Sequence, residues 1–211
     1  MSRTAPLERL EKGVKFARKG DLIAAIDCFS EVIEANPEFT AAYNNRGISY
    51  ASQGEYERAI DDLTMAIKLD PDNAEALNYR GYSNSALNHY DLAIEDCTQA
   101  IALDPSDARP YSNRGLAHFG KGDLRSAIAD LSQAIRLNPE FFAALNNRGI
   151  VYAKGRNYVE AIADYSKAIQ IRPQLIDAYV NRAAAYVAKG DRAKADADLA
   201  KAAQLKAAAG N

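Results

Sequence analysis

Few residues in this chain are of the types that catalyse reactions or hold metal ions. The two histidines, His89 and His118, lie 29 residues apart and match no metal-ligand spacing. Neither Cys28 nor Cys97 has the neighbouring basic pair that activates a nucleophilic thiolate. The sequence also contains no glycine-rich phosphate loop, nucleophile elbow or His–Glu helix signature. We therefore expect no enzyme activity, no metal site and no cofactor.

Composition narrows the remaining classes of function. The chain has 211 residues, of which 48% are hydrophobic and 26% charged, so it can fold as one or two domains. Its formal net charge of −2 lacks the basic field that nucleic-acid binding needs. Two cysteines cannot form a disulfide scaffold. With no apolar leader and no membrane-length apolar run, the sequence predicts a cytoplasmic protein without a membrane partner.

Prolines reveal an internal repeat. Five of the seven stand at a constant spacing of 34 residues: Pro37, Pro71, Pro105, Pro139 and Pro173. With these prolines at repeat position 32, six units fill the chain without linkers. They span residues 6–39, 40–73, 74–107, 108–141, 142–175 and 176–209.

Each unit has the pattern of two helices. Apolar residues recur at intervals of three and four over positions 1–14 and again over positions 17–30. Between them lies a turn such as Gly20-Asp21 or Gly122-Asp123, in which glycine accepts positive φ. After the second helix, pairs such as Asn36-Pro37 predict a proline stop.

These residues resemble the tetratricopeptide repeat, a 34-residue helix pair with small or large residues at fixed positions. In the second repeat, the residues at these fixed positions are Tyr43, Gly47, Tyr50, Ala59, Leu63, Ala66 and Pro71. Departures from the pattern are local: Arg9, Lys12, Asn84, Cys97, His118 and Ala207. The resemblance implies an all-α, right-handed superhelical solenoid of six helix-turn-helix repeats and twelve helices, forming a single domain over residues 6–209.

Small residues mark the predicted crossing of the two helices in each repeat. Glycine in mid-helix costs about 1 kcal/mol relative to alanine, so close packing should offset it. Position 8 is Gly13, Gly47, Gly81, Gly115 and Gly149, and position 20 is alanine in all six repeats. The two ends of the array are expected to be capped. Asp196 and Ala203 replace isoleucines of the earlier repeats, so residues 193–209 are expected to form a capping helix of a complete solenoid. Arg9 and Lys12 are expected to cap its start.

Arginine and aspartate recur together at positions 7 and 23. Five repeats carry both, whereas the first has Lys12 and Cys28 instead. We therefore expect five ion pairs that tie the two helices of a repeat together, with the alternative of an anion-binding arginine row. The pairs are Arg46 and Asp62, Arg80 and Asp96, Arg114 and Asp130, Arg148 and Asp164, and Arg182 and Asp198.

One face of the first helices is the candidate binding surface, because the resemblance implies that these helices line a concave groove. Asparagines recur on this face at positions 5 and 6, and their amides could hydrogen-bond the backbone of an extended peptide. They are Asn44, Asn45, Asn78, Asn113, Asn146, Asn147 and Asn181. The alternative is that asparagine is common and solvated at this position of the family.

An apolar stripe accompanies these asparagines. It comprises Ile48, Tyr82, Leu116 and Ile150 at position 9, with Phe119 one turn further on. Tyr79, Tyr82 and Phe119 would be its aromatic anchors. The alternative is that these residues pack between the helices. The second helices present Ser30, Thr64, Thr98, Ser132 and Ser166, a face expected to be solvated and not an interface.

Family members that bind a C-terminal carboxylate use lysine, arginine and asparagine at set groove positions. Here the corresponding positions hold Leu10, Val14, Glu75 and Tyr79. We therefore expect no strong carboxylate clamp and no typical Hsp70 or Hsp90 tail binding.

The most favoured function is a non-catalytic scaffold that binds an extended segment of another protein in its groove. The second hypothesis is a self-associating homo-oligomeric scaffold, which light scattering would exclude if it found a strict monomer. The third is catalysis, which would require an activity that is lost on changing His118 or Glu75.

Overall fold

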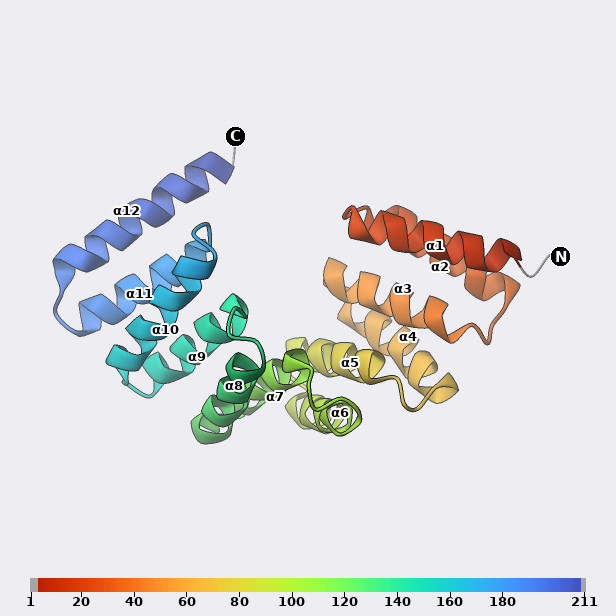
Figure 1. Ribbon diagram of the computed structural model, residues 1–211, viewed down its shortest axis with the longest axis horizontal. Helices are drawn as coiled ribbons and strands as arrows, with labels where there is room; N and C mark the ends of the chain where they lie inside the picture. Colours follow the sequence, from red (N-terminus) through yellow and green to blue (C-terminus); the bar gives the residue numbers. More distant parts are fainter. Residues whose placement is uncertain (1–3, 210–211) are drawn as a thin grey trace. The chain divides into compact units, whose positions relative to one another are not determined.

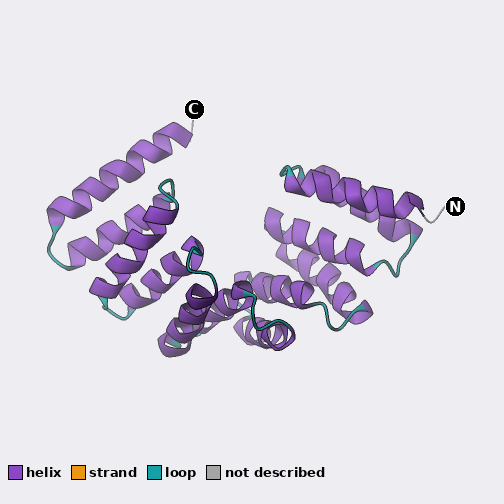
Figure 2. Ribbon diagram, viewed as in Figure 1, coloured by secondary structure: helices purple, strands orange, loops and turns teal. Residues whose placement is uncertain are grey.

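The computed structural model describes residues 4–209, and these form helices joined by short turns (Figure 2). The all-α class is confirmed. The helices are α1 Thr4–Arg18, α2 Leu22–Ala35, α3 Thr40–Gln53, α4 Tyr56–Leu69, α5 Ala74–Ala86, α6 Tyr90–Leu103, α7 Ala108–Gly120, α8 Leu124–Leu137, α9 Phe142–Lys154, α10 Tyr158–Ile171, α11 Ile176–Ala188 and α12 Arg192–Ala209.

The helices group into two compact units, Met1–Pro105 and Ser106–Asn211. The first contains the pairs α1–α2, α3–α4 and α5–α6, and the second contains α7–α8, α9–α10 and α11–α12 (Figure 1). Each pair is one 34-residue repeat. Within a unit, the second helix of a pair also packs against the first helix of the next, as α2 does against α3 and α10 against α11.

Close packing explains the mid-helix glycines. A Cβ atom at Gly47 would lie 2.7 Å from Leu63 Cγ and 3.3 Å from the carbonyl oxygen of Ala59. At Gly149 it would lie 2.6 Å from the ring of Tyr165. The two helices of a pair therefore approach at a distance that only glycine permits, and the position-20 alanines are fully buried at the crossing.

The end of each repeat follows from its proline. Asn36, Asp70, Asp104, Asn138 and Arg172, the residues before the five prolines, have φ between −149° and −130° and end the preceding helix. At the far end of the array, Asp196 and Ala203 are exposed on α12, as expected. Arg9 on α1 is not simply solvated, because it forms an ion pair with Glu31.

The turn inside each repeat requires positive φ at position 15. Glycine provides it in four repeats, with φ between 81° and 85° at Gly20, Gly54, Gly122 and Gly190. Asn88 and Arg156 occupy the same position with φ of 63° and 62°. Asparagine tolerates this conformation, whereas arginine is strained in it by about 1–2 kcal/mol.

Replacing Arg156 by glycine should therefore stabilise the protein. We expect Arg156→Gly to raise the free energy of unfolding by about 0.5–1 kcal/mol, because relief of strain exceeds the added entropy of the unfolded chain. Chemical denaturation measures this change. Lys189→Gly is the matched control at φ −89° and should not stabilise the protein; equal gains in both variants would contradict the strain at Arg156.

Candidate functional site

Five arginine–aspartate pairs join the two helices of a repeat, in repeats two to six. Arg46 Nε donates to Asp62 Oδ2 at 2.7 Å and Arg46 Nη2 donates to Oδ1 at 2.8 Å. The pairs Arg80–Asp96, Arg114–Asp130, Arg148–Asp164 and Arg182–Asp198 have the same two-bond geometry, with distances of 2.6–3.0 Å. Every aspartate is buried. Each pair therefore fixes one helix against the other by a planar, bidentate contact.

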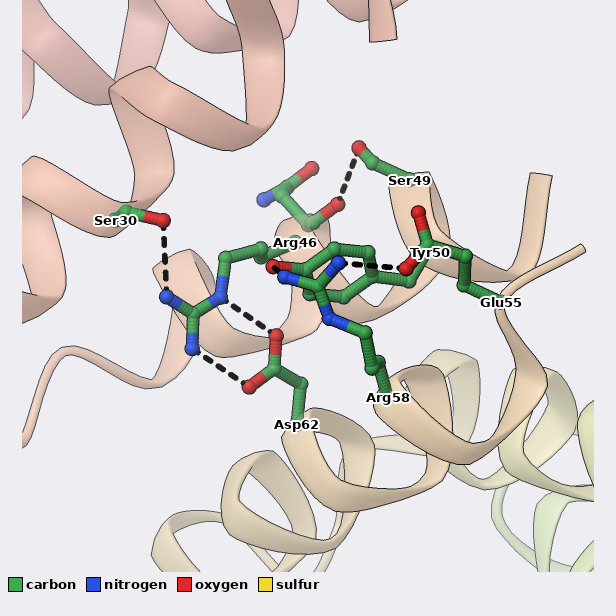
Figure 3. Close-up of polar contacts among 8 residues, drawn as sticks. Ser30, Arg46, Ser49, Tyr50, Glu55, Arg58 and Asp62 are labelled. Atoms are coloured by element: carbon green, nitrogen blue, oxygen red, sulfur yellow. Dashed lines mark hydrogen bonds and ion pairs between the residues drawn. The ribbon is translucent and has the colours of Figure 1, made fainter. Parts of the chain in front are cut away.

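The same arginines reach the preceding repeat. Arg46 Nη1 donates to Ser30 Oγ at 3.0 Å, so its guanidinium joins α3 to α4 and also to α2 (Figure 3). Equivalent bonds connect Arg80 with Thr64, Arg148 with Ser132 and Arg182 with Ser166. We call this contact, with aspartate on one side and a hydroxyl of the preceding repeat on the other, the arginine fork.

The arginine fork corrects the expectation that the serines and threonines of the second helices are only solvated. Ser30, Thr64, Ser132 and Ser166 lie at the interface between repeats and accept hydrogen bonds there. The sequence contained a signal for this role. Position 25 is serine or threonine in the five repeats that an arginine repeat follows, and it is Ala200 in the last.

Hydrogen bonds to the aspartates keep the arginines of the forks protonated. Hydrogen bonds to Asp62, Asp164 and Asp198 raise the pKa of Arg46, Arg148 and Arg182, and burial opposes this increase only in part. Each guanidinium thus already has a carboxylate. These observations disfavour the alternative of an anion-binding arginine row.

Tyrosine rings cover several forks. In the second repeat, the Tyr50 ring centre lies 5.9 Å from the Arg46 guanidinium and 3.9 Å from that of Arg58, which also donates a hydrogen bond to the Tyr50 hydroxyl (Figure 3). Tyr50 is only 5% exposed. The ring therefore contacts two cations, one of them the guanidinium of the fork.

In the first unit, the candidate groove residues lie on α3 and α5 but do not all face solvent. Asn44 and Asn78 are buried, and Asn44 Nδ2 donates to Glu75 Oε2 at 3.0 Å, joining neighbouring first helices. Asn45 Nδ2 donates to the carbonyl of Ala41 in its own helix at 2.7 Å. The amides of positions 5 and 6 therefore differ in role and do not form one continuous row.

The apolar residues of this surface are partly accessible. Ile48 and Tyr79 are half-buried against the core cluster around Leu63. Tyr82 is 38% exposed, and its ring packs edge-on against Tyr56 with 5.9 Å between the ring centres. Of the predicted anchors in the first unit, Tyr82 is the most available to a partner.

In the second unit, the corresponding residues lie on α7, α9 and α11. Asn113, Leu116, Asn147 and Ile150 are half-buried, and Phe119 packs against the core cluster around Leu131. Asn181 Nδ2 donates to Asn146 Oδ1 at 3.3 Å, again between neighbouring first helices.

Two further residues of this face escaped the sequence analysis. Val180 and Val187 on α11 are 43% and 54% exposed. They occupy positions 5 and 12 of the sixth repeat, two turns apart on one side of α11 and next to the side that carries Asn181. Their apolar character at groove positions was the available signal.

The histidines lie far from any constellation of catalytic groups. His89 is exposed at the start of α6, and His118 Nε2 lies 3.9 Å from Asp130 Oδ2, a carboxylate that Arg114 already binds. Among the described residues, no group of three or more histidines, cysteines or carboxylates could hold a metal ion. Within residues 4–209, no helix is long and apolar enough to cross a membrane.

Comparisons with known proteins agree with this geometry. Models of the tetratricopeptide repeat match residues 40–73, 74–107, 112–176 and 176–208. A crystal structure of MamA is 30% identical and matches with a TM-score of 0.67, covering 78% of this chain and 96% of that chain. The chain belongs to the tetratricopeptide repeat family.

Other solved tetratricopeptide repeat structures share the fold at lower identity. A chain of the APC/C hetero-tetramer Cut9-Hcn1 is 23% identical with a TM-score of 0.87, covering 95% of this chain and 40% of that chain. Pseudomonas aeruginosa pilF is 20% identical with a TM-score of 0.78, covering 92% and 89%. A search of curated protein sequences found no match.

Removing the aspartate of an arginine fork should lower the free energy of unfolding more than removing its hydroxyl partner. We expect Asp62→Ala to cost about 2 kcal/mol, because it leaves a half-buried guanidinium without its carboxylate. Ser30→Ala removes only the bond to the preceding repeat and should cost about 0.5–1 kcal/mol. Thermal and urea unfolding measure both losses.

Ser52→Ala is the matched control, since the Ser52 hydroxyl bonds only to the carbonyl of Ile48 in its own helix. Its loss of stability should be smaller than that of Ser30→Ala. An Asp62→Ala variant as stable as the wild type would contradict a structural role for the fork.

Proposed function

We propose that this tetratricopeptide repeat protein is a non-catalytic interaction module that binds an extended segment of another protein along the exposed face of its first helices. Membership of the family supports protein binding in general. The observation that carries the proposal is the apolar exposure of Tyr82, Val180 and Val187 on first helices, next to half-buried amides. Within the second unit, Val180 and Val187 lie two turns apart on one side of α11, and neighbouring exposed apolar side chains of this kind often mark a binding surface.

The chemistry of this face supports a neutral, extended ligand. Asn147 and Asn113 are half-buried and provide amide groups that can pair with a peptide backbone. Ile48, Leu116 and Ile150 provide shallow apolar contacts beside them. Glu75 places a carboxylate on the same face of the first unit, bound to Asn44. A negative group there disfavours a peptide that ends in a free carboxylate, in keeping with the predicted lack of Hsp70 and Hsp90 tail binding.

Self-association is the second candidate. Val180 occupies the position at which Asn44 and Asn146 contact the next first helix within their units, and it is 43% exposed on α11. A second copy of the chain could cover it. Sedimentation equilibrium distinguishes the two functions: a dimer that Val180→Asp dissociates would favour self-association, and a monomer would favour peptide binding.

A peptide selection tests the proposed groove. Short random peptides would be selected on the wild-type protein, and the affinity of the best binders measured by fluorescence anisotropy. We expect the combined substitution Tyr82→Ser/Asn147→Ala/Val187→Ser to weaken binding at least tenfold, about 1.4 kcal/mol, because it removes apolar and amide contacts from the face.

The matched control is Ile23→Ser/Val159→Ser, which removes still more exposed apolar residues from second helices. It should leave the affinity unchanged. Equal affinity of the groove variant and the wild type, or loss of binding in the control alone, would contradict the proposal. Circular dichroism verifies that each variant is folded.

A further inference from the structure

Position 11 supplies one of the two kinds of ring that lie against the arginine forks, the other being the position-4 tyrosines of the second, fourth and sixth repeats. Tyr50, Tyr152 and Tyr186 occupy position 11 in the second, fifth and sixth repeats. Their ring centres lie 5.9, 5.7 and 5.9 Å from the guanidinium groups of the arginines at position 7. A tyrosine at position 11 with its ring against the fork is therefore an arrangement that this chain itself uses three times.

The third repeat has no ring at this position. Asn84 replaces the tyrosine, and Leu92 stands where Arg58 covers the ring in the second repeat. The Asn84 side chain is buried and donates to Asp96 Oδ2 at 3.1 Å, so it lies against the ion pair and does not extend over it.

A hollow results between α4, α5 and α6. Its volume is about 250 Å³, several times the 30 Å³ or so that one water molecule takes up in the liquid. Its lining includes the apolar side chains of Ile60 and Leu92 together with the Arg80–Asp96 pair. Leu92 is 52% exposed, so the apolar rim is open to solvent. We call this feature the Asn84 hollow.

The sixth repeat shows what the ring does. A hollow of about 380 Å³ lies there against Val159, Ile162 and Tyr186, but neither Arg182 nor Asp198 lines it. There the Tyr186 ring lines the depression in place of its fork, whereas beside the smaller Asn84 the Arg80–Asp96 pair itself lines the hollow.

We propose that the Asn84 hollow is a docking site for a tyrosine side chain of a partner protein. The ring would enter between Ile60 and Leu92 with its face toward the Arg80 guanidinium, as in the three sister repeats. Its hydroxyl would donate to the carboxylate of Glu95, which also lines the hollow. Because Asp96 already neutralises Arg80 and Glu95 adds a negative charge, the site rejects a phosphorylated ring.

This site is independent of the proposed groove. The hollow lies on α4, α5 and α6 and takes one side chain, whereas the groove residues of the first unit lie on another face of α3 and α5. A partner that uses both would hold the repeat protein from two sides, which raises its avidity without enlarging either contact.

The test uses p-cresol, the side-chain analogue of tyrosine, titrated into isotope-labelled protein and followed by NMR. We expect saturable shifts of the Ile60 and Leu92 methyl groups and of the Asn84 side-chain amide at millimolar ligand. In Asn84→Tyr, the protein's own ring fills the hollow, so p-cresol should bind at least tenfold more weakly while the melting temperature rises.

Three comparisons make the result decisive. Leu92→Asp alters an exposed residue, keeps the fold, and should also abolish binding, whereas Ile23→Asp, at a more exposed site on α2, should not. Phenyl phosphate should cause no saturable shift in the wild type. Unchanged p-cresol binding in Asn84→Tyr or Leu92→Asp, or shifts no larger at Leu92 than at the exposed Leu7 and Val159, would overturn the proposal.

Discussion

The arginine fork is the interaction on which the arrangement of this protein depends. One half-buried guanidinium binds an aspartate 16 residues later in its own repeat and a hydroxyl 16 residues earlier in the preceding one, as Arg46 does with Asp62 and Ser30. A buried ion pair alone contributes little net stability, because desolvation opposes its attraction. Its planar, bidentate geometry, however, can form in only one register of the two helices relative to each other. The fork thus sets both the internal geometry of a repeat and the step to the next.

The same interaction determines where binding can take place. Because each arginine at position 7 is held by its carboxylate, the cations on this side of the helices are not available to an anionic ligand. The remaining surface of the first helices carries amides and apolar side chains, among them the exposed Val187, Val180 and Tyr82. Where asparagine replaces the position-11 tyrosine, the fork lines a surface hollow, as Arg80 and Asp96 line the Asn84 hollow. The residue at position 11 therefore connects the arginine fork, which holds the repeats together, with the hollow that we propose as a docking site.

Much of the fold followed from the sequence because every repeat places a residue in nearly the same environment. The helix bounds, the glycine of each close crossing and the residue before each proline could be predicted from the 34-residue register. The partners of the arginines within a repeat could be found as well, since Arg46 and Asp62 recur together. The same register places Arg156 where four repeats have glycine, a signal for positive φ that the sequence analysis does not use and that the backbone bears out with φ of 62°.

Contacts between repeats were harder to predict. Ser30 was read as solvated because its partner lies in the following repeat and each repeat was considered by itself. Asn44 and Asn45 were treated alike, although adjacent residues of a helix point about 100° apart, so one binds Glu75 on the next first helix and the other its own backbone. Asn84 was noted as a departure from the family pattern, but the hollow it leaves depends on side-chain volumes that the pattern does not contain.

Native-state hydrogen exchange on the variant Arg148→Met/Asp164→Leu tests most directly whether the fork couples neighbouring repeats. This pair of substitutions keeps an apolar contact between α9 and α10 and leaves no orphaned charge, so the main loss is the bond from Arg148 to Ser132 on α8. Asp196→Ala, an exposed change on α12, provides the control. We predict that amide protection on α8 falls at least tenfold in the double variant, about 1.4 kcal/mol of coupling, and stays unchanged in the control. Protection on α8 equal to that of the wild type would contradict the account.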